Sequence, residues 1–273
     1  MSHNAAYPAG ATPKPDSSAS AARLVHLEGG VNFRDFGGYS TADGRTMRRG
    51  LLFRSGALDR LTKDDVSKVS RLGLRQIIDF RDPHEAMQRP NIAIPGIPSD
   101  LVPANPPSYG GGASLRQMAA RALHGGDPVV FMQELYRKLP FENQAYRHMM
   151  SALQHIAEGG LLLHCMIGKD RTGVGCAIVQ LALGADNDTI IEDYLITETE
   201  LKDFKARAMT EFAAEFSVSE IEGMSVLMSA RVEFIQATLD VIKDRFGDME
   251  KYLEFEFGLT PDRLERLREQ YLN

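Results

Sequence analysis

The pattern of hydrophobic and polar positions divides the chain into short buried strands and amphipathic helices. Extended segments with tight turns are expected over 23–41, which contains two pairs of glycines, and a strand is expected within 46–58, "TMRRGLLFRSGAL". Apolar runs within 74–82, "LRQIIDFRD", and 159–165, "GGLLLHC", predict two more buried strands.

Helix start and stop signals fill the intervals between these strands. Thr62 is a plausible N-cap and Gly73 a plausible end for one helix, and Asp127 followed by Pro128 opens another. Apolar residues at helical spacing predict a helix over 142–158, and one more is expected over 114–123. Residues 83–114 carry seven prolines and four glycines, which predicts a long loop at the functional face.

The second half of the chain is mostly helical in pattern. A helix is expected from Arg171 to Gly184, and further helices from Asp186 to the end with breaks near Ser217, Asp248 and Thr260. Alternation of strands and helices predicts an α/β fold with a central four- to five-stranded sheet flanked by helices and an additional helical C-terminal region. Catalytic loops in such folds lie at the carboxyl ends of strands.

Three segments are expected along the chain. Residues 1–22 are rich in Pro, Ser and Ala and lack the apolar stretch of a signal peptide, which predicts a disordered tail. Residues 23–273 are expected to form one catalytic domain. Within it, 200–245 carries several Phe and Met residues at helical spacing, which fits either ordinary packing or a helical lid over the site.

Composition narrows the class of protein. The chain has 273 residues and a net charge of −6, which argues against nucleic-acid binding and against general binding to membrane surfaces. No window of about 18 apolar residues is present, so no transmembrane segment is expected. Two cysteines are too few for a disulfide framework. A cytoplasmic location is expected, with leaderless export as the alternative.

The chemistry is concentrated in "HCMIGKDRTG", residues 164–173. A strand delivers Cys165 to a loop that turns directly into a helix, so backbone N–H groups and the helix N-terminus can form an anion site. A thiol in that site is stabilised as a thiolate, and the Thr172 hydroxyl is placed to donate to the sulfur. Arg171 offers a fork that matches two phosphate oxygens. The pattern indicates phosphoryl transfer through a covalent intermediate.

At these residues the sequence resembles the protein tyrosine phosphatases, which share the Cys-x5-Arg signature with a preceding His and a following Thr-Gly. The segments "GGVNFRDFGGY", "LFRSGAL", "IIDFRDPHE" and "GKDRTG" are similar to a bacterial subfamily of broad specificity. The resemblance implies metal-free hydrolysis of phosphotyrosine in proteins, with no cofactor and with phosphate or sulfate accepted in the site. Phosphoinositide hydrolysis and dual or triple specificity are the alternatives.

The resemblance also implies a role for each residue of the loop. Cys165 is the nucleophile and Arg171 holds the phosphate and stabilises the transition state. The residues expected to line the phosphate cradle are Met166, Ile167, Gly168, Lys169, Asp170 and Arg171. Strand alternation turns the His164 side chain away from the site, so it is expected to shape the loop by a hydrogen bond. Lys169 adds a second cation that would favour substrates with several phosphates, unless it is a solvated loop lysine.

The general acid has two candidates. The chain contains no Trp, so a Trp-Pro-Asp loop is excluded. Asp170, inside the cradle, is the favoured acid, and Asp82 is the second candidate. Structural roles are the alternatives for both: Asp82 as the cap of the following turn, and Asp170 as an ion-pair partner of Arg171 or Lys169.

Further motif residues are expected to hold the cradle rather than to react. They are Arg34, Asp35, Arg54, Ser55, Asp79 and Arg81. Two other functions compete with the phosphatase reading. A pseudophosphatase that only binds phosphorylated partners would not need the nucleophile. An arsenate reductase normally needs resolving cysteines, and Cys176, on the helix after the cradle, is placed for core packing.

Overall fold

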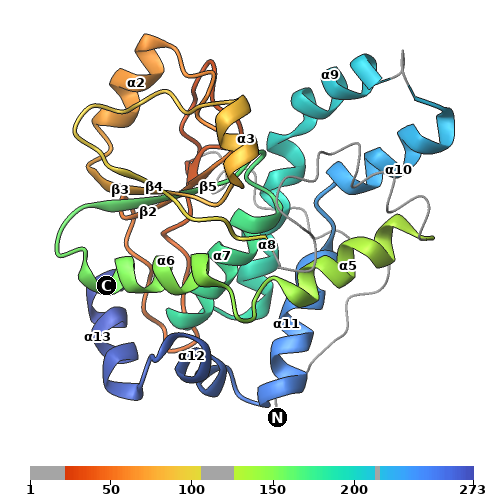
Figure 1. Cartoon of the computed structure of the whole chain (residues 1–273). Helices are drawn as coiled ribbons and strands as arrows, with labels where there is room; N and C mark the ends of the chain where they lie inside the picture. Colours follow the sequence, from red (N-terminus) through yellow and green to blue (C-terminus); the bar gives the residue numbers. More distant parts are fainter. Residues whose placement is uncertain (1–21, 106–125, 213–215) are drawn as a thin grey trace.

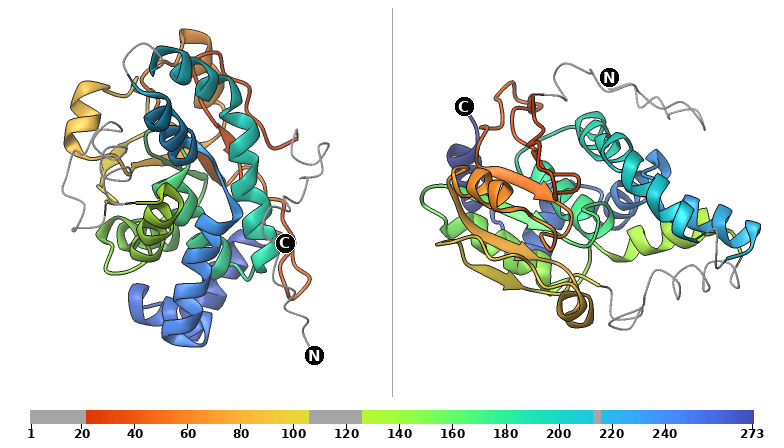
Figure 2. Two further views of the ribbon diagram at one scale, coloured as in Figure 1. Left: turned by 90° about the vertical axis from the view of Figure 1, so that its right-hand side faces the viewer. Right: turned by 90° about the horizontal axis from the view of Figure 1, so that it is seen from above.

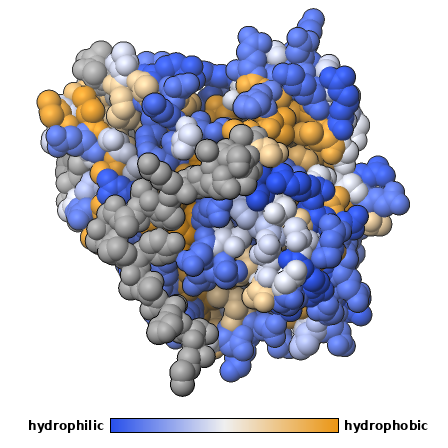
Figure 3. Space-filling model, turned by 180° about the vertical axis from the view of Figure 1, so that it is seen from behind, coloured by the Kyte–Doolittle hydropathy of each residue, from blue (hydrophilic) through white to orange (hydrophobic). Residues whose placement is uncertain are grey.

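The computed structural model describes residues 22–105, 126–212 and 216–273. The disordered tail expected over 1–22, apart from Ala22, and the helix expected over 114–123 fall outside these ranges. Within them, no helix combines the length and apolar character that crossing a membrane requires. Viewed from behind, the surface is largely hydrophilic, and hydrophobic residues gather mainly in the upper half of the view (Figure 3).

A five-stranded sheet in the order β1-β2-β5-β3-β4 forms the centre of the fold (Figure 1). The pair β1–β2 is antiparallel and the other pairs are parallel. The strands are β1 (Arg34–Asp35), β2 (Leu52–Ser55), β3 (Leu74–Asp79), β4 (Ser99–Leu101) and β5 (Gly160–His164). The helices are α2 (Lys63–Ser70), α3 (Pro83–Gln88), α5 (Pro128–Lys138), α6 (Gln144–His155), α7 (Asp170–Ala182), α8 (Asn187–Glu200), α9 (Lys202–Phe212), α10 (Val218–Met228), α11 (Val232–Phe246), α12 (Met249–Phe257) and α13 (Pro261–Tyr271). The α/β fold with a mixed sheet flanked by helices is therefore confirmed.

Side-chain alternation along β5 separates the two faces of the sheet. Leu161 and Leu163 belong to the larger core cluster, which also contains residues of α6 and α7. Leu162 belongs to a smaller cluster with Val69 of α2. Because successive side chains of a strand point to opposite faces, His164 follows Leu162, and Cys165 follows Leu161 and Leu163 into the larger cluster.

The register of the sheet brings the sequence motifs together. His164, the last residue of β5, pairs with Ser55 at the end of β2 and with Asp79 at the end of β3. Since these strands are parallel, their carboxyl ends lie at one edge of the sheet. Three motifs that are far apart in the chain therefore meet where ligands bind in open α/β folds.

Helix boundaries agree well with the capping signals. Thr62, Asp127, Ser217 and Asp248 each accept a hydrogen bond from a backbone N–H of the helix that follows, as N-caps do. The uninterrupted loop predicted over 83–114 is wrong, because this stretch contains α3 and β4.

The segment 200–245 does not behave as one unit. In α11, residues such as Phe234, Ile235 and Leu239 are buried in the larger core. Met224 and Leu227 of α10 belong to the same core, while α9 and α10 lie on the opposite side of the molecule from α13 (Figures 1 and 2). Ordinary packing therefore accounts for α11 and for part of α10, and the helical lid stays a prediction.

Candidate active site

Cys165 directly follows β5 and is almost fully buried, with 2% of its surface exposed. The chain then turns through Met166–Lys169 and enters α7. Gly168 has φ +69°, and a Cβ built there would lie 2.5 Å from the Ser55 carbonyl oxygen. Only glycine fits this turn without strain, because the left-handed conformation and the close backbone approach both exclude a side chain.

The carbonyl groups of residues 166–168 accept hydrogen bonds from other segments of the chain. The Asn32 amide donates to the carbonyls of Ile167 (3.2 Å) and Gly168 (3.1 Å), and Arg54 Nη2 donates to Gly168 (2.9 Å). The Ala57 N–H binds the Met166 carbonyl at 3.0 Å. Within the described ranges, no hydrogen bond is donated by the N–H groups of 166–169. The turn therefore has fixed carbonyls and free N–H groups, as an anion cradle requires.

The first turn of α7 adds to this cradle. Its leading N–H groups have no partner inside the helix, and the helix dipole favours an anion there. Tyr146, on α6, donates its hydroxyl to the Arg171 carbonyl at 2.7 Å and fixes this turn from the other side. The Thr172 hydroxyl is fully buried and has no hydrogen-bond partner among the described residues, so it is free to donate to a neighbouring group.

Arg171 is held by Glu85 of α3. Nη1 donates to Oε2 at 2.6 Å and Nη2 to Oε1 at 2.9 Å, and Nη1 also approaches the Phe80 carbonyl at 3.3 Å. Burial would lower the pKa of Arg171, but Glu85 and the neighbouring Cys165 raise it above its ordinary value. A guanidinium has five N–H groups, so the edge formed by Nε and the second Nη2 hydrogen remains for a ligand.

Glu85 is itself fixed by the start of α3. Asp82 is the N-cap: one carboxylate oxygen accepts from the N–H groups of His84 and Glu85, both at 2.9 Å, while the Asp82 N–H donates to Glu85 Oε2 at 2.9 Å. Burial alone would raise the pKa of Glu85, but its bonds to Arg171 lower it to about 2. Asp82, a candidate acid, is 2% exposed and occupies the capping position that was its alternative role.

Asp170, the other candidate acid, is the first residue of α7. Its Oδ1 accepts from the Tyr136 hydroxyl at 2.8 Å and lies 3.2 Å from Lys169 Nζ. The Tyr136 hydroxyl is also 2.7 Å from that of Tyr194. The side chain of Asp170 is 23% exposed. One carboxylate oxygen is thus held in place, and the group as a whole remains accessible.

The Lys169 side chain is fully buried. Its ammonium donates to the carbonyl of Leu227, at the end of α10, and to that of Ser229 at 3.1 Å. Burial lowers its pKa, and Asp170 acts in the opposite direction. The expected solvated or substrate-facing cation is therefore engaged in this structure by protein oxygens, while the Lys169 backbone still belongs to the cradle.

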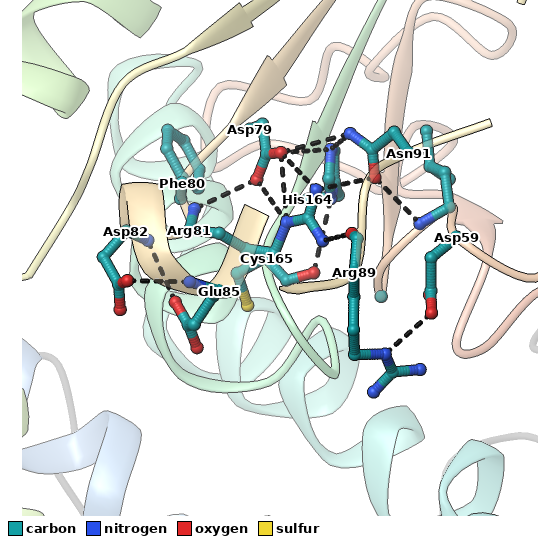
Figure 4. A network of polar contacts seen from close by, with 12 residues as sticks. Asp59, Asp79, Phe80, Arg81, Asp82, Glu85, Arg89, Asn91, His164 and Cys165 are labelled. Carbon is teal, nitrogen blue, oxygen red and sulfur yellow. Dashed lines mark hydrogen bonds and ion pairs between the residues drawn. The ribbon is translucent and has the colours of Figure 1, made fainter. Parts of the chain in front are cut away.

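Figure 4 shows the polar contacts around His164, the residue that precedes Cys165. His164 is fully buried; its Nδ1 lies 3.3 Å from the Cys165 carbonyl and its Nε2 lies 3.1 Å from the Asn91 amide. Arg81 binds Asp79 through Nε and Nη2 at 2.7–3.0 Å. Burial lowers the pKa of His164, with Asp79 opposing it. A neutral, buried imidazole in these contacts supports the loop.

A second polar group lies beneath the cradle. Asp193 of α8 binds Arg34 Nε at 3.2 Å and Arg54 Nη1 at 2.5 Å, and all three side chains are buried. Burial would raise the pKa of Asp193, but the two arginines lower it. Asp35 is separate, because it accepts from the N–H groups of Gly37 and Gly50.

The residues that support the cradle and were not predicted include Asn32, Glu85, Tyr136, Tyr146 and Asp193. Of these, only Glu85 carried a local signal, because Asp82-Pro83-His84-Glu85 has the form of a capping box that starts a helix. The others lie in segments whose packing against the cradle depends on the tertiary fold. Cys176 is buried in α7, where burial raises its pKa to about 12, as expected for a core thiol.

Comparisons with known proteins agree with this geometry. A model of the tyrosine phosphatase family matches residues 25–273. A Cupriavidus necator protein named as a tyrosine-protein phosphatase is 31% identical over 81% of this chain and 80% of its own length. The triple specificity protein phosphatase PtpB of Mycobacterium tuberculosis is 28% identical over 89% of this chain and 96% of its own.

Among solved structures, one match is the core catalytic domain of the PP-IP phosphatase SIW14 from S. cerevisiae, in complex with citrate. Its TM-score is 0.34 and its identity 14%, over 70% of this chain and 90% of that one.

Proposed function

The chain belongs to the tyrosine phosphatase family and is a cysteine-dependent phosphatase, and we propose that it hydrolyses phosphotyrosine in proteins through a cysteinyl-phosphate intermediate. One observation carries the proposal. The buried Cys165 thiol borders a turn with unpaired N–H groups and lies near an arginine with one open edge. This combination matches a tetrahedral phosphate and a nucleophile that attacks it.

In the first step the Cys165 thiolate attacks phosphorus in line, the P–O bond to the substrate breaks, and a P–S bond forms. The N–H groups of 166–169 and the open edge of Arg171 hold the equatorial oxygens, where charge is spread in the transition state. The unpaired Thr172 hydroxyl supports a role as a donor to the sulfur. Water then cleaves the P–S bond, and phosphate leaves.

The departing oxygen needs a proton, and Asp170 is the better candidate. Its carboxylate is 23% exposed and is positioned by Tyr136 and Lys169, which leaves one oxygen without a partner among the described residues. Asp82 is nearly inaccessible and caps α3. Asp170→Asn is therefore expected to lower turnover strongly while phosphate binding survives. Asp82→Asn is expected to leave turnover and α3 nearly unchanged, because Asn caps a helix about as well as Asp.

The test is hydrolysis by the wild type and by Cys165→Ser, with EDTA present. The substrate panel contains a phosphotyrosine peptide, a phosphoserine peptide and phosphoinositide vesicles. We expect the phosphotyrosine peptide to be hydrolysed fastest and all activity to disappear in Cys165→Ser. Activity that survives in Cys165→Ser would disprove the covalent step. Faster turnover of phosphoinositides would replace the protein substrate with a lipid one, and phosphopeptide binding without turnover would identify a pseudophosphatase.

Asp170→Asn is tested over the acidic pH range. A kcat that equals that of the wild type throughout this range would exclude Asp170 as the acid. In that case, a large loss of kcat in Asp82→Asn would transfer the role to Asp82.

A further inference from the structure

A cavity of about 480 Å³ lies between α6, α12 and α13. None of the residues that line it belongs to the cradle. It includes His155, at the end of α6 and just before the start of β5, whereas Cys165 follows the carboxyl end of the same strand. Lys169 of the cradle contacts the end of α10, and in Figure 1 α13 lies far from α9 and α10. The cavity is thus separate from the catalytic site.

Two helix faces form its walls. Arg147, Ser151 and Gln154 are four and three positions apart on α6, so they share one face. On α13, the lining residues include Arg263, Arg266 and Gln270, which are three and four positions apart. The Gln270 amide donates to the Ile156 carbonyl, and the Tyr271 hydroxyl donates to the Leu153 carbonyl at 3.1 Å. These bonds hold α13 against the end of α6, so the cavity is preformed.

The lining is cationic and rich in hydrogen-bond donors. It contains three arginines and His155 but no carboxylate, in a chain whose net charge is −6. The carboxylate of Glu256 is nearby, but it is engaged by Arg147 at 3.0 Å and by the Glu142 N–H at 3.0 Å. Local positive charge therefore remains after this pairing.

Two guanidinium groups are available to a ligand. Arg266 is exposed and makes no hydrogen bond or ion pair with any residue in the described ranges, and Arg263 uses one N–H group on the Gly258 carbonyl at 3.2 Å. His155 commits Nδ1 to the Ser151 carbonyl at 2.7 Å, which leaves Nε2. Arginine forks bind phosphate oxygens in pairs, with short charge-assisted bonds.

We propose that this cavity is a second anion site that takes a small molecule carrying two or more phosphate groups. Its volume lies within the roughly 300–1,000 Å³ range of small-molecule sites, so a single phosphate ion would leave much of it empty. Two open guanidinium groups on one helix face suit two anionic groups better than one. Leu267 and Phe257 supply the apolar part of the lining. The site would bind its ligand independently of the proposed phosphatase reaction.

Inorganic tripolyphosphate is the probe, measured by titration calorimetry on the full chain carrying Arg171→Ala, which weakens binding in the cradle. We expect one saturable site in this background. Adding Arg263→Gln and Arg266→Gln should weaken that binding at least tenfold. The matched control adds Lys63→Gln and Arg71→Gln, which removes two exposed charges from α2 and its end, and should change the affinity less than twofold. Orthophosphate should bind more weakly than tripolyphosphate.

Arg266→Gln alone provides a second test, because Arg263 also contacts the end of α12 and its loss could disturb the fold. This single variant should weaken binding severalfold in the Arg171→Ala background. In a chain that keeps Arg171, Arg266→Gln should leave phosphatase activity at the wild-type level. Absence of saturable binding, binding unaffected by the α13 variants, or equal losses in the α2 control would each overturn the proposal. The last result would mean that only overall charge matters.

Discussion

Two arginine–carboxylate pairs flank the cradle, and they differ in whether the arginine keeps N–H groups that a ligand could bind. In the Arg171–Glu85 pair, the side chains are 13% and 21% exposed, and one edge of Arg171 is open. In the Arg54–Asp193 pair they are 0% and 1% exposed, and the Nη groups of Arg54 are bound by Asp193 and the Gly168 carbonyl. The first pair presents a cation to a ligand, and the second fixes the shape of the loop.

The second pair also contributes electrostatically. Asp193 is shared with Arg34, so two buried cations face one buried anion. The remaining positive charge lies in a region of low dielectric, where its field is weakly screened, and Arg54 contacts the cradle directly. In the proposed mechanism, this charge favours phosphate and thiolate in the cradle without contact with the substrate.

The comparison predicts the largest effect for Arg171→Lys. Lysine keeps the charge but cannot bind Glu85 and two phosphate oxygens at once. We expect kcat/KM on a phosphotyrosine peptide to fall about 10³-fold or more, with the fold retained by circular dichroism. If more than a tenth of kcat/KM survived, the open edge of Arg171 would not be the phosphate clamp.

Asp193→Asn should have its main effect on stability. It leaves Arg34 and Arg54 buried without a compensating carboxylate, which typically costs about 3–5 kcal/mol of unfolding free energy. Urea unfolding measures the change. Asp188→Asn, at an exposed position of the same helix, is the matched control and should stay within about 0.5 kcal/mol. Similar losses in both variants would show that the ion pairs of Asp193 with Arg34 and Arg54 do not cause the loss of stability.

Glu85 makes the first pair sensitive to acid. Its pKa is lowered from 4.5 to about 2 in the folded protein, so its contribution to stability is fully present above 4.5 and is lost as pH falls from 4.5 through about 2. Linkage gives this contribution as about 3 kcal/mol. Urea unfolding of the wild type and Glu85→Gln at pH 6 and pH 3 measures it.

Other carboxylates also titrate in this window, so the difference between the two proteins is the informative quantity. We expect the wild type to lose more stability than Glu85→Gln between the two pH values. Parallel losses in both proteins would contradict the role of Glu85.

The parts of the fold that could be predicted are those specified locally. Caps such as Ser217 and Asp248 mark helix starts because their side chains bond backbone N–H groups only a few residues away. The break between α10 and α11 was missed: Arg231 precedes α11 without a side-chain capping bond, so no local signal marks it. The helix α3 was missed for a different reason: a capping box at Asp82 marks its start, but the proline-rich composition of 83–114 favoured a loop.

The candidate site divides in the same way. The Cys165–Thr172 stretch could be interpreted from sequence because one strand, one turn and one helix start place all its groups. The direction of the Lys169 ammonium could not, since its acceptors are carbonyls of Leu227 and Ser229, some 60 positions later in the chain. Contacts of this kind arise only when helices pack.

Tyr136→Phe is expected to have the smallest effect of the four changes. It removes the hydroxyl that binds Asp170 at 2.8 Å, which should cost about 1 kcal/mol of stability. If this bond positions Asp170 for catalysis, kcat should also fall severalfold. Tyr39→Phe is the control, because the Tyr39 hydroxyl is buried without a hydrogen-bond partner among the described residues. Its removal should leave kcat unchanged and stability equal or higher. If the two variants behaved alike, the Tyr136 hydroxyl would only fill space, and Asp170 would owe its position to Lys169 and the start of α7.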